Sequence, residues 1–153
     1  MMKSMVKSIL YLAFVIYVMT VDAYGETIMQ KQLAPCPDKP NCVFSGSKDP
    51  EHAIDPYRYS GDADTARHLL VRIIQKQART EIINQEESYI HVTFTSMILR
   101  FTDDVEFLFD DSKKIIHVRS ASRVGRSDFG VNRKRVELLR GLLNAELERS
   151  DKK

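Results

Sequence analysis

The sequence has 153 residues, with 23 Lys and Arg against 21 Asp and Glu, which allows one compact domain and leaves little room for a second. Hydrophobic residues make up 43% and charged residues 29%, values that argue against wholesale disorder, a collagen helix or a coiled coil. A formal net charge of +2 is too small for general nucleic-acid binding, and no segments are apolar for long enough to form a protein with several membrane spans.

The chain begins with the pattern of a signal peptide. Lys3 and Lys7 precede thirteen uncharged and mostly apolar residues, 9–21, and small residues follow at the positions that a signal peptidase reads. We therefore predict a signal peptide over residues 1–23, cleaved after Ala23. An uncleaved anchor is the alternative, but thirteen residues rise only about 20 Å as a helix, against a hydrocarbon core of roughly 30 Å. Cleavage predicts an exported protein, periplasmic or secreted, without a stable transmembrane anchor.

An N-terminal arm over residues 24–35 would follow, with cleavage after Gly25 as the second choice. Two cysteines, Cys36 and Cys42, come next, six positions apart in the segment CPDKPNC. In an oxidising compartment we expect them to form a disulfide, worth about 2 to 2.5 kcal/mol through loop-closure entropy. Neither a second Cys pair nor closely spaced His residues follow, and redox catalysis normally uses Cys-x-x-Cys. We therefore predict a structural disulfide, no metal and no cofactor.

The next elements are a loop and a helix. Residues 36–60 are rich in Pro, Asp, Ser and Gly, which predicts an ordered loop with a short extended piece at 57–59. Asp62 is a plausible helix cap, and an apolar stripe at helical spacing follows it at Ala66, Leu69, Leu70, Ile73 and Ile74.

After residue 79 the apolar period changes from helical to two. Residues 90–94, 105–109 and 116–122 alternate apolar with polar side chains, and residues 80–85 predict a weaker strand. A last helix over residues 132–149 would turn Val136, Leu139, Leu142, Leu143 and Leu147 toward a core, and residues 150–153 would fray. We predict a single α+β domain over residues 36–149: an antiparallel sheet of about four strands with two helices packed on one face.

The predicted sheet has a polar face, which is more often solvated than functional in an open antiparallel sheet; it carries His91, Thr93, Glu106, His117 and Arg119. Because Phe107 and Ile116 must share the core face, two hairpin registers are possible. A two-residue loop would place Asp104 opposite Arg119, and a four-residue loop would place Glu106 there. Either register gives Arg119 an internal carboxylate partner.

The strongest concentration of charge is the segment 119–135, where six cations occur within seventeen residues. Gly125 and Gly130 permit unusual backbone conformations there, and an anion should compensate the cations at the start of the last helix. One hypothesis is a binding site for an anion or an acidic ligand, formed by Arg119, Ser120, Ser122, Arg123, Arg126, Asn132, Arg133 and Arg135. The alternative is a structural network in which these arginines pair with Asp103, Asp104 and Asp128.

Three motifs make the chain recognisable: CPDKPNC at residues 36–42, FTSMILRFTDDVEF at 94–107 and IHVRSASRVGRSDFGVNRKR at 116–135. In this order they resemble the family catalogued as domain of unknown function 1499, over roughly residues 33–143. The resemblance implies an exported or envelope-associated bacterial protein with relatives in plastids. It implies no reaction, ligand or catalytic residue.

Enzymatic motifs are missing from the sequence: there is no metal-binding His-Glu-x-x-His, no Gly-x-Ser-x-Gly elbow and no phosphate-binding Walker loop. We therefore favour a non-enzymatic envelope module that binds a small anionic ligand or a protein partner, and not nucleic acid. The alternative is a small hydrolase-like enzyme that acts on an acidic substrate with Asp103 or Asp104 as acid/base. A deep cleft holding a carboxyl group of raised pKa would favour catalysis, whereas a shallow Arg-lined rim would favour binding.

Overall fold

The structure, a computed structural model, describes residues 31–150 and residue 152. The predicted signal peptide and residues 24–30 of the predicted arm lie outside the described residues, as do residues 151 and 153 of the predicted tail. Gln32–Lys153 form a compact unit by themselves.

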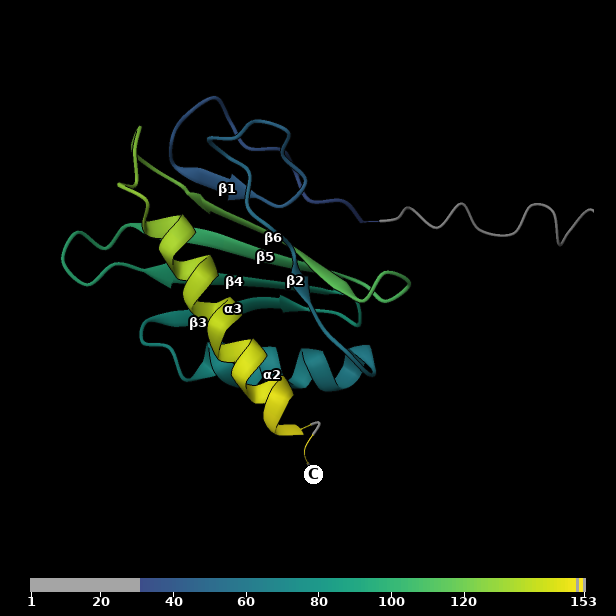
Figure 1. Ribbon diagram of the computed structural model, residues 1–153. Coiled ribbons are helices and arrows are strands. Elements are labelled where there is room, and N and C mark those ends of the chain that lie inside the picture. The colour runs from purple at the N-terminus through teal and green to yellow at the C-terminus, as the bar shows by residue number, and fades with distance from the viewer. Residues whose placement is uncertain (1–30, 151, 153) are drawn as a thin grey trace, which may run out of the picture. The chain divides into compact units, whose positions relative to one another are not determined.

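Six strands form one antiparallel sheet in the order β1, β6, β5, β4, β3, and β2 also pairs with β6 (Figure 1). β1 and β2 follow one another along the same edge of β6. The strands are β1 (Cys42–Phe44), β2 (Tyr57–Arg58), β3 (Thr80–Gln85), β4 (Tyr89–Thr95), β5 (Thr102–Asp110) and β6 (Ile115–Ser122).

Two helices, α2 (Ala63–Gln75) and α3 (Val131–Ser150), cover one face of this sheet (Figure 1). The predicted α+β class is therefore confirmed. Asp62 caps α2 as expected, because its Oδ1 accepts the backbone N–H of Thr65 at 2.7 Å. The core joins both helices to alternate strand residues, with Tyr57, Leu70, Ile74, Ile90, Phe107, Ile116, Val136 and Leu143 among its fully buried members.

The strand count is higher than predicted, because the segment read as a loop contributes two short strands. β2 coincides with the extended piece expected at residues 57–59. β1 has only three residues, too few to show an alternating pattern, and it owes its strand geometry to the edge of β6 that it pairs with. Leu142 also departs from the prediction: it is 37% exposed, because α3 buries the stripe Val136, Leu139, Leu143 and Leu147 instead.

The hairpin between β5 and β6 has the four-residue loop of the two registers that the sequence allowed. Asp110 pairs with Ile115, and Glu106 consequently lies opposite Arg119. At the other end of the hairpin, Asp103 pairs with Ser122. This register decides which arginines meet which carboxylates.

Several loops leave the sheet at one end. β3 starts and β4 ends there, with Thr80 opposite Phe94, and β5 starts where β6 ends. The backbone N–H of Arg123 donates to Thr102 O at 3.1 Å, which ties the last two strands together at this end. We call this region the loop end: residues 76–79, 96–101 and 123–130, together with residues 131–134 in the first turn of α3.

Candidate functional site

The pleat of β6 divides the predicted binding residues between two faces of the sheet. Ser120 and Ser122 lie on the face covered by the helices, where both bond to Asn132 of α3. Arg119 and Arg123 lie on the outer face, opposite the helices, where they meet carboxylates of β5. The eight predicted residues therefore do not converge on one ligand.

Asn132 is the centre of the helix-side group and is fully buried. Its Nδ2 donates to Asn41 O at 3.0 Å and to Ser122 Oγ at 2.9 Å, while its Oδ1 accepts from Ser120 Oγ and from Arg135 Nη1. All four hydrogen-bonding positions of this amide are occupied within the chain. Asn132 thus joins α3, β6 and the residue before β1, and it has no capacity left for a ligand.

Arg135 forms a largely buried ion pair in this group. Its Nη2 donates to Asp103 Oδ2 at 2.6 Å, and the two side chains are only 13% and 11% exposed. The guanidinium also lies 4.8 Å from the centre of the Phe94 ring, at a distance typical of a cation–π contact. Arg135 is therefore part of the packing between α3 and the sheet.

Arg133 holds the loop between β1 and β2 against α3. Its Nη1 donates to Ala53 O at 2.7 Å and its Nη2 donates to Glu51 O at 2.9 Å. Both acceptors are main-chain carbonyl oxygens, which fixes the path of that loop. These two bonds occupy the Nη1 and Nη2 edge of the guanidinium, which is therefore not available for a bidentate contact with an anion.

Asp128 caps α3, whereas we expected it in the ion-pair network. Its Oδ1 accepts the backbone N–H of Gly130 at 2.9 Å, and its Oδ2 accepts the backbone N–H of Asn132 at 2.8 Å. The first turn of α3 contains no acidic residue, so this carboxylate supplies the negative charge that the helix dipole favours there. The anion that we expected to compensate the cations at the start of this helix is thus the carboxylate of Asp128, a residue of the chain itself.

On the outer face, Asp104 joins His91 to Arg123. Arg123 donates two parallel bonds of 2.8 Å to the carboxylate, and His91 Nε2 lies 2.8 Å from Asp104 Oδ1. The Arg123 guanidinium, with a smaller contribution from His91, holds the pKa of the Asp104 carboxyl group below its ordinary value against the opposing effect of partial burial. Asp104 is therefore ionised at neutral pH and is not a general acid there.

A second group on the outer face surrounds Glu106. Arg119 Nη1 donates to Glu106 Oε2 at 3.1 Å, and the Tyr89 hydroxyl donates to Oε1 at 2.7 Å. The two charged side chains are 15% and 19% exposed. Arg119 consequently has the carboxylate partner that the register arithmetic required.

Arg126 is the exception among the predicted arginines. It is exposed in the loop between β6 and α3, and no hydrogen bond or ion pair engages its side chain in the described part of the chain. Lys134, which the sequence analysis did not single out, is likewise exposed and contacts no carboxylate within residues 31–150. Two further exposed cations of the loop end, Arg79 and Arg100, also contact no carboxylate in the part of the chain that the structure describes; Arg79 Nε donates to Thr95 O.

A shallow groove of about 430 Å³ lies beside these cations. The turn after α2 and the first half of α3 form its sides, and Phe94 and Leu138 make part of it apolar. Arg79 and Lys134 stand at its border, so two of the uncompensated cations belong to the same depression. The sequence held a signal for the neighbouring β4–β5 loop, since residues 94–101 include Arg100 and no acidic residue.

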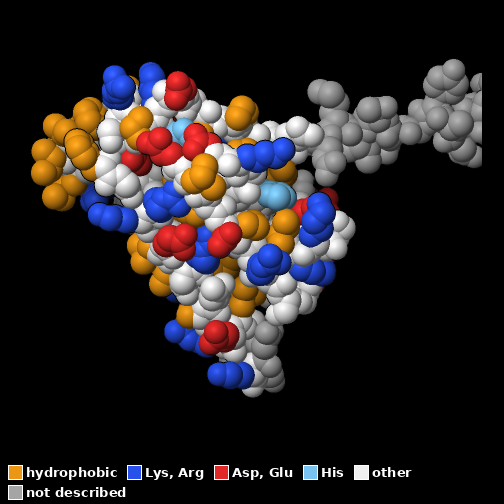
Figure 2. Space-filling view, turned by 45° about the horizontal axis from the view of Figure 1, so that its top comes forward, with side chains coloured by type: hydrophobic (Ala, Val, Ile, Leu, Met, Phe, Trp, Pro, Cys, Tyr) orange, Lys and Arg blue, Asp and Glu red, His pale blue; other side chains and the backbone are white. Residues whose placement is uncertain are grey.

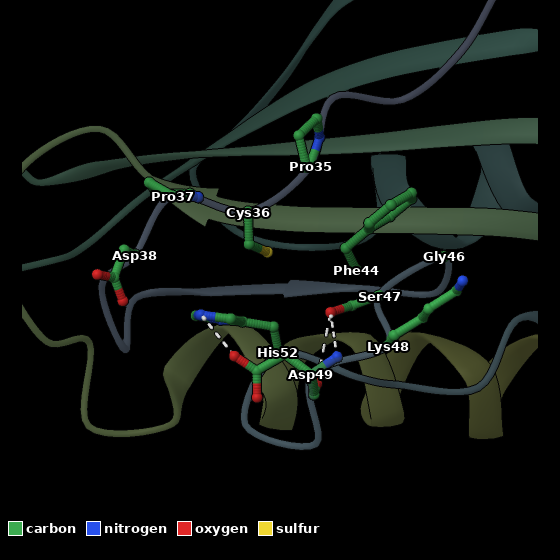
Figure 3. A pocket seen from close by; sticks show the side chains of 10 residues that line it. All are labelled: Pro35, Cys36, Pro37, Asp38, Phe44, Gly46, Ser47, Lys48, Asp49 and His52. Carbon is green, nitrogen blue, oxygen red and sulfur yellow. Dashed lines mark hydrogen bonds and ion pairs between the residues drawn. The ribbon is translucent and has the colours of Figure 1, made fainter.

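Another depression, of about 340 Å³, lies between the segment around the disulfide and the loop after β1 (Figure 3). The predicted Cys36–Cys42 disulfide is confirmed and borders it. His52 Nδ1 lies 3.0 Å from Cys42 O, and its Nε2 lies 3.9 Å from Asp49 Oδ2. Ser47 Oγ accepts the backbone N–H of Asp49 and, among the described residues, forms no bond to the His52 ring. These contacts shape the loop and do not form a nucleophile–base pair.

Among residues 31–150, no group of three or more His, Cys, Asp or Glu side chains is placed to hold a metal ion. Within the same described range, no helix combines the length and the apolar content needed to cross a bilayer.

The chain matches the family described as Protein of unknown function (DUF1499) over residues 32–143. The protein belongs to this family. The match confirms the resemblance carried by the three motifs, and it includes the whole sheet, α2 and the start of α3. Neither the curated proteins nor the solved structures compared with the chain include a match.

Proposed function

We propose that this DUF1499 protein is an exported, non-enzymatic binding module that recognises an anionic ligand at the loop end. The observation that carries the proposal is that four exposed cations, Arg79, Arg100, Arg126 and Lys134, lie in the loop end and contact no carboxylate of the described residues. Of the binding residues expected from the sequence, we retain Arg126 as a direct contact. The other expected arginines pair with carboxylates or main-chain carbonyl oxygens of the chain itself.

Export is supported by the signal-peptide pattern of residues 1–23 together with the Cys36–Cys42 disulfide, since disulfides persist in oxidising compartments such as the periplasm. We do not retain the hydrolase alternative. The Asp103 carboxylate is paired with Arg135 at 2.6 Å. Arg123 holds the pKa of the Asp104 carboxyl group below its ordinary value, so Asp104 is ionised at neutral pH and does not serve as a proton donor there. The shallow, cation-bordered groove also fits binding better than catalysis.

The proposal is tested by the melting temperature in a panel of phosphate, sulfate, glycerol phosphate and acidic sugars. The patch variant carries Arg100→Gln, Arg126→Gln and Lys134→Gln. The matched control carries Lys48→Gln, Arg58→Gln and Lys152→Gln, which remove the same charge from exposed positions outside the loop end. Lys152 lies beyond the far end of α3, and a helix of 20 residues is about 30 Å long.

An anion at one hundred times its dissociation constant should stabilise the wild type and the control by about 2.7 kcal/mol, which raises the melting temperature by several degrees. The patch variant should show no shift. If no anion shifts the wild type, or if all three proteins shift equally, the loop end is not an anion site.

A further inference from the structure

The loop end also carries an exposed apolar tip. Met97, Ile98 and Leu99, in the loop between β4 and β5, are 68%, 81% and 66% exposed, and Phe129 in the loop between β6 and α3 is 88% exposed. Figure 2 shows hydrophobic side chains gathered at the end of the molecule where the β4–β5 loop lies in Figure 1, with Lys and Arg side chains beside them. Single exposed apolar residues need no explanation, but a contiguous apolar patch marks an interaction site.

Hydrogen bonds hold this tip in place. The backbone N–H of Ser96 donates to Phe101 O at 2.8 Å, and the backbone N–H of Phe101 donates to Ser96 Oγ at 2.9 Å, which closes the loop at its base. In the neighbouring loop, the backbone N–H of Phe129 donates to Ser127 Oγ at 3.2 Å. A surface formed before binding loses little conformational entropy when it docks.

Cations flank the tip. Arg100 follows Leu99 directly, Arg126 lies three residues before Phe129, and Lys134 stands at the border of the adjacent groove. The acidic side chains of this end of the sheet are already engaged: Asp103 with Arg135, Asp104 with Arg123, and Asp128 with the start of α3. The tip therefore combines apolar side chains with positive charge that nothing in the described chain neutralises.

This combination matches a surface in which negative charge overlies an apolar layer. A soluble anion would contact the cations and leave the aliphatic side chains in water. We propose that the loop end docks on a bilayer that contains anionic phospholipids, with Met97, Ile98 and Leu99 entering the interfacial region and Arg100, Arg126 and Lys134 contacting the lipid phosphates. This inference rests on the proposed function, because it names the anionic ligand of the same site.

Tryptophan fluorescence tests the docking geometry, because the sequence contains no tryptophan. Leu99→Trp places a single fluorophore at the tip, and Ile83→Trp places one at a half-exposed position of β3 as the control. The protein is used without residues 1–23, the predicted signal peptide, because an apolar leader would bind vesicles of either composition by itself. Emission from residue 99 reports on this loop alone, so membrane contact elsewhere in the chain does not produce the signal.

Vesicles of phosphatidylglycerol and phosphatidylcholine should shift the Leu99→Trp emission to shorter wavelength, and lipids brominated in the acyl chain should quench it. Vesicles of phosphatidylcholine alone should have no effect, and Ile83→Trp should not respond to either. Adding the patch substitutions Arg100→Gln, Arg126→Gln and Lys134→Gln to Leu99→Trp should weaken binding about a hundredfold, at roughly fivefold per cation. The control substitutions at Lys48, Arg58 and Lys152 should not weaken it.

The outcomes separate the two proposals. If soluble anions stabilise the protein through the patch cations but Leu99→Trp does not respond to anionic vesicles, the bilayer inference is wrong and the proposed function stands. If neither response occurs, both are wrong. If the Leu99→Trp emission responds to anionic vesicles equally with and without the patch substitutions, the patch cations do not contact the lipid phosphates and that part of the inference is wrong. A concentration-dependent blue shift without vesicles, abolished on dilution, would assign the tip to a second copy of the chain and would also overturn the bilayer inference.

Discussion

Replacing Arg135 by Met tests whether the buried arginines hold the fold together. The substitution removes the 2.6 Å pair with Asp103, the bonds to Asn132 and Ser120 and the cation–π contact with Phe94, while methionine keeps an unbranched apolar side chain at this position. Removing one partner of a buried ion pair typically costs 3–5 kcal/mol, because the other charge stays buried without compensation. Both side chains are slightly exposed, so we expect a loss at the lower end, about 3 kcal/mol.

The loss can be measured by urea unfolding followed by far-ultraviolet circular dichroism. For a domain of this size, with a slope of roughly 2 kcal/mol per molar urea, the midpoint should fall by about 1.5 M. The double variant Asp103→Ala with Arg135→Met should be more stable than the sum of the single losses predicts, by about 1 to 3 kcal/mol, since the two side chains contact each other.

Arg126→Met is the matched control, because it removes the same charge and the same guanidinium from an exposed position without a partner in the described chain. Its stability should stay within about 0.5 kcal/mol of the wild type. If Arg135→Met also unfolds within that margin, or if the losses at Asp103 and Arg135 are simply additive, the pair does not support the fold. Arg135 would then return to the set of residues available to a ligand.

Two further predictions concern the disulfide and the outer face. The double variant Cys36→Ser with Cys42→Ser removes the disulfide and should lower the free energy of unfolding by about 2 kcal/mol. Calorimetry should then show a melting temperature lower by roughly 8 °C. An unchanged melting temperature would mean that the disulfide does not stabilise the domain. The pKa of Asp104 is lowered in the folded state. The ionised carboxylate therefore stabilises the folded protein above the unfolded-state pKa of about 3.9, and this stabilisation is lost as the pH falls through the lower folded-state pKa. Arg123→Gln removes the main cause of the lowered pKa of Asp104, so the melting temperature of the variant should fall less steeply with decreasing pH than that of the wild type below about pH 4. If the melting temperatures of both proteins fall equally steeply, Arg123 does not lower this pKa.

The main elements of the fold could be predicted because each carries its own periodic pattern. The stripe from Ala66 to Ile74 and the alternation around Phe107 each bury one face, and burial decides the structure there. β1 could not be predicted, because its three residues acquire strand geometry only from a partner some 77 positions away in the chain, as in the pairing of Val43 with Ser120. The hairpin register stayed open for a similar reason: alternation fixes which residues share a face, but two loop lengths satisfy it equally.

The candidate site was harder to predict than the fold. The alternation of β6 already implied that Ser120 and Arg119 point to opposite faces, so the single cluster drawn from segment 119–135 combined residues that the pleat separates. Which arginines were internal depended on carboxylates that lie far away in sequence, such as Asp103 for Arg135. No local pattern distinguishes Arg135 from Arg126, because the difference between them lies in tertiary pairing.

The apolar tip carried a local signal of a different kind. Met97, Ile98 and Leu99 are three consecutive apolar residues between strand residues that alternate, and a strand cannot bury three consecutive side chains on one face. A turn does not bury them either, since it projects away from the core, as their exposure shows. An apolar run at such a position lowers solubility unless a partner covers it. Any partner must therefore account for the aliphatic tip as well as for the uncompensated cations beside it, which a purely ionic ligand does not.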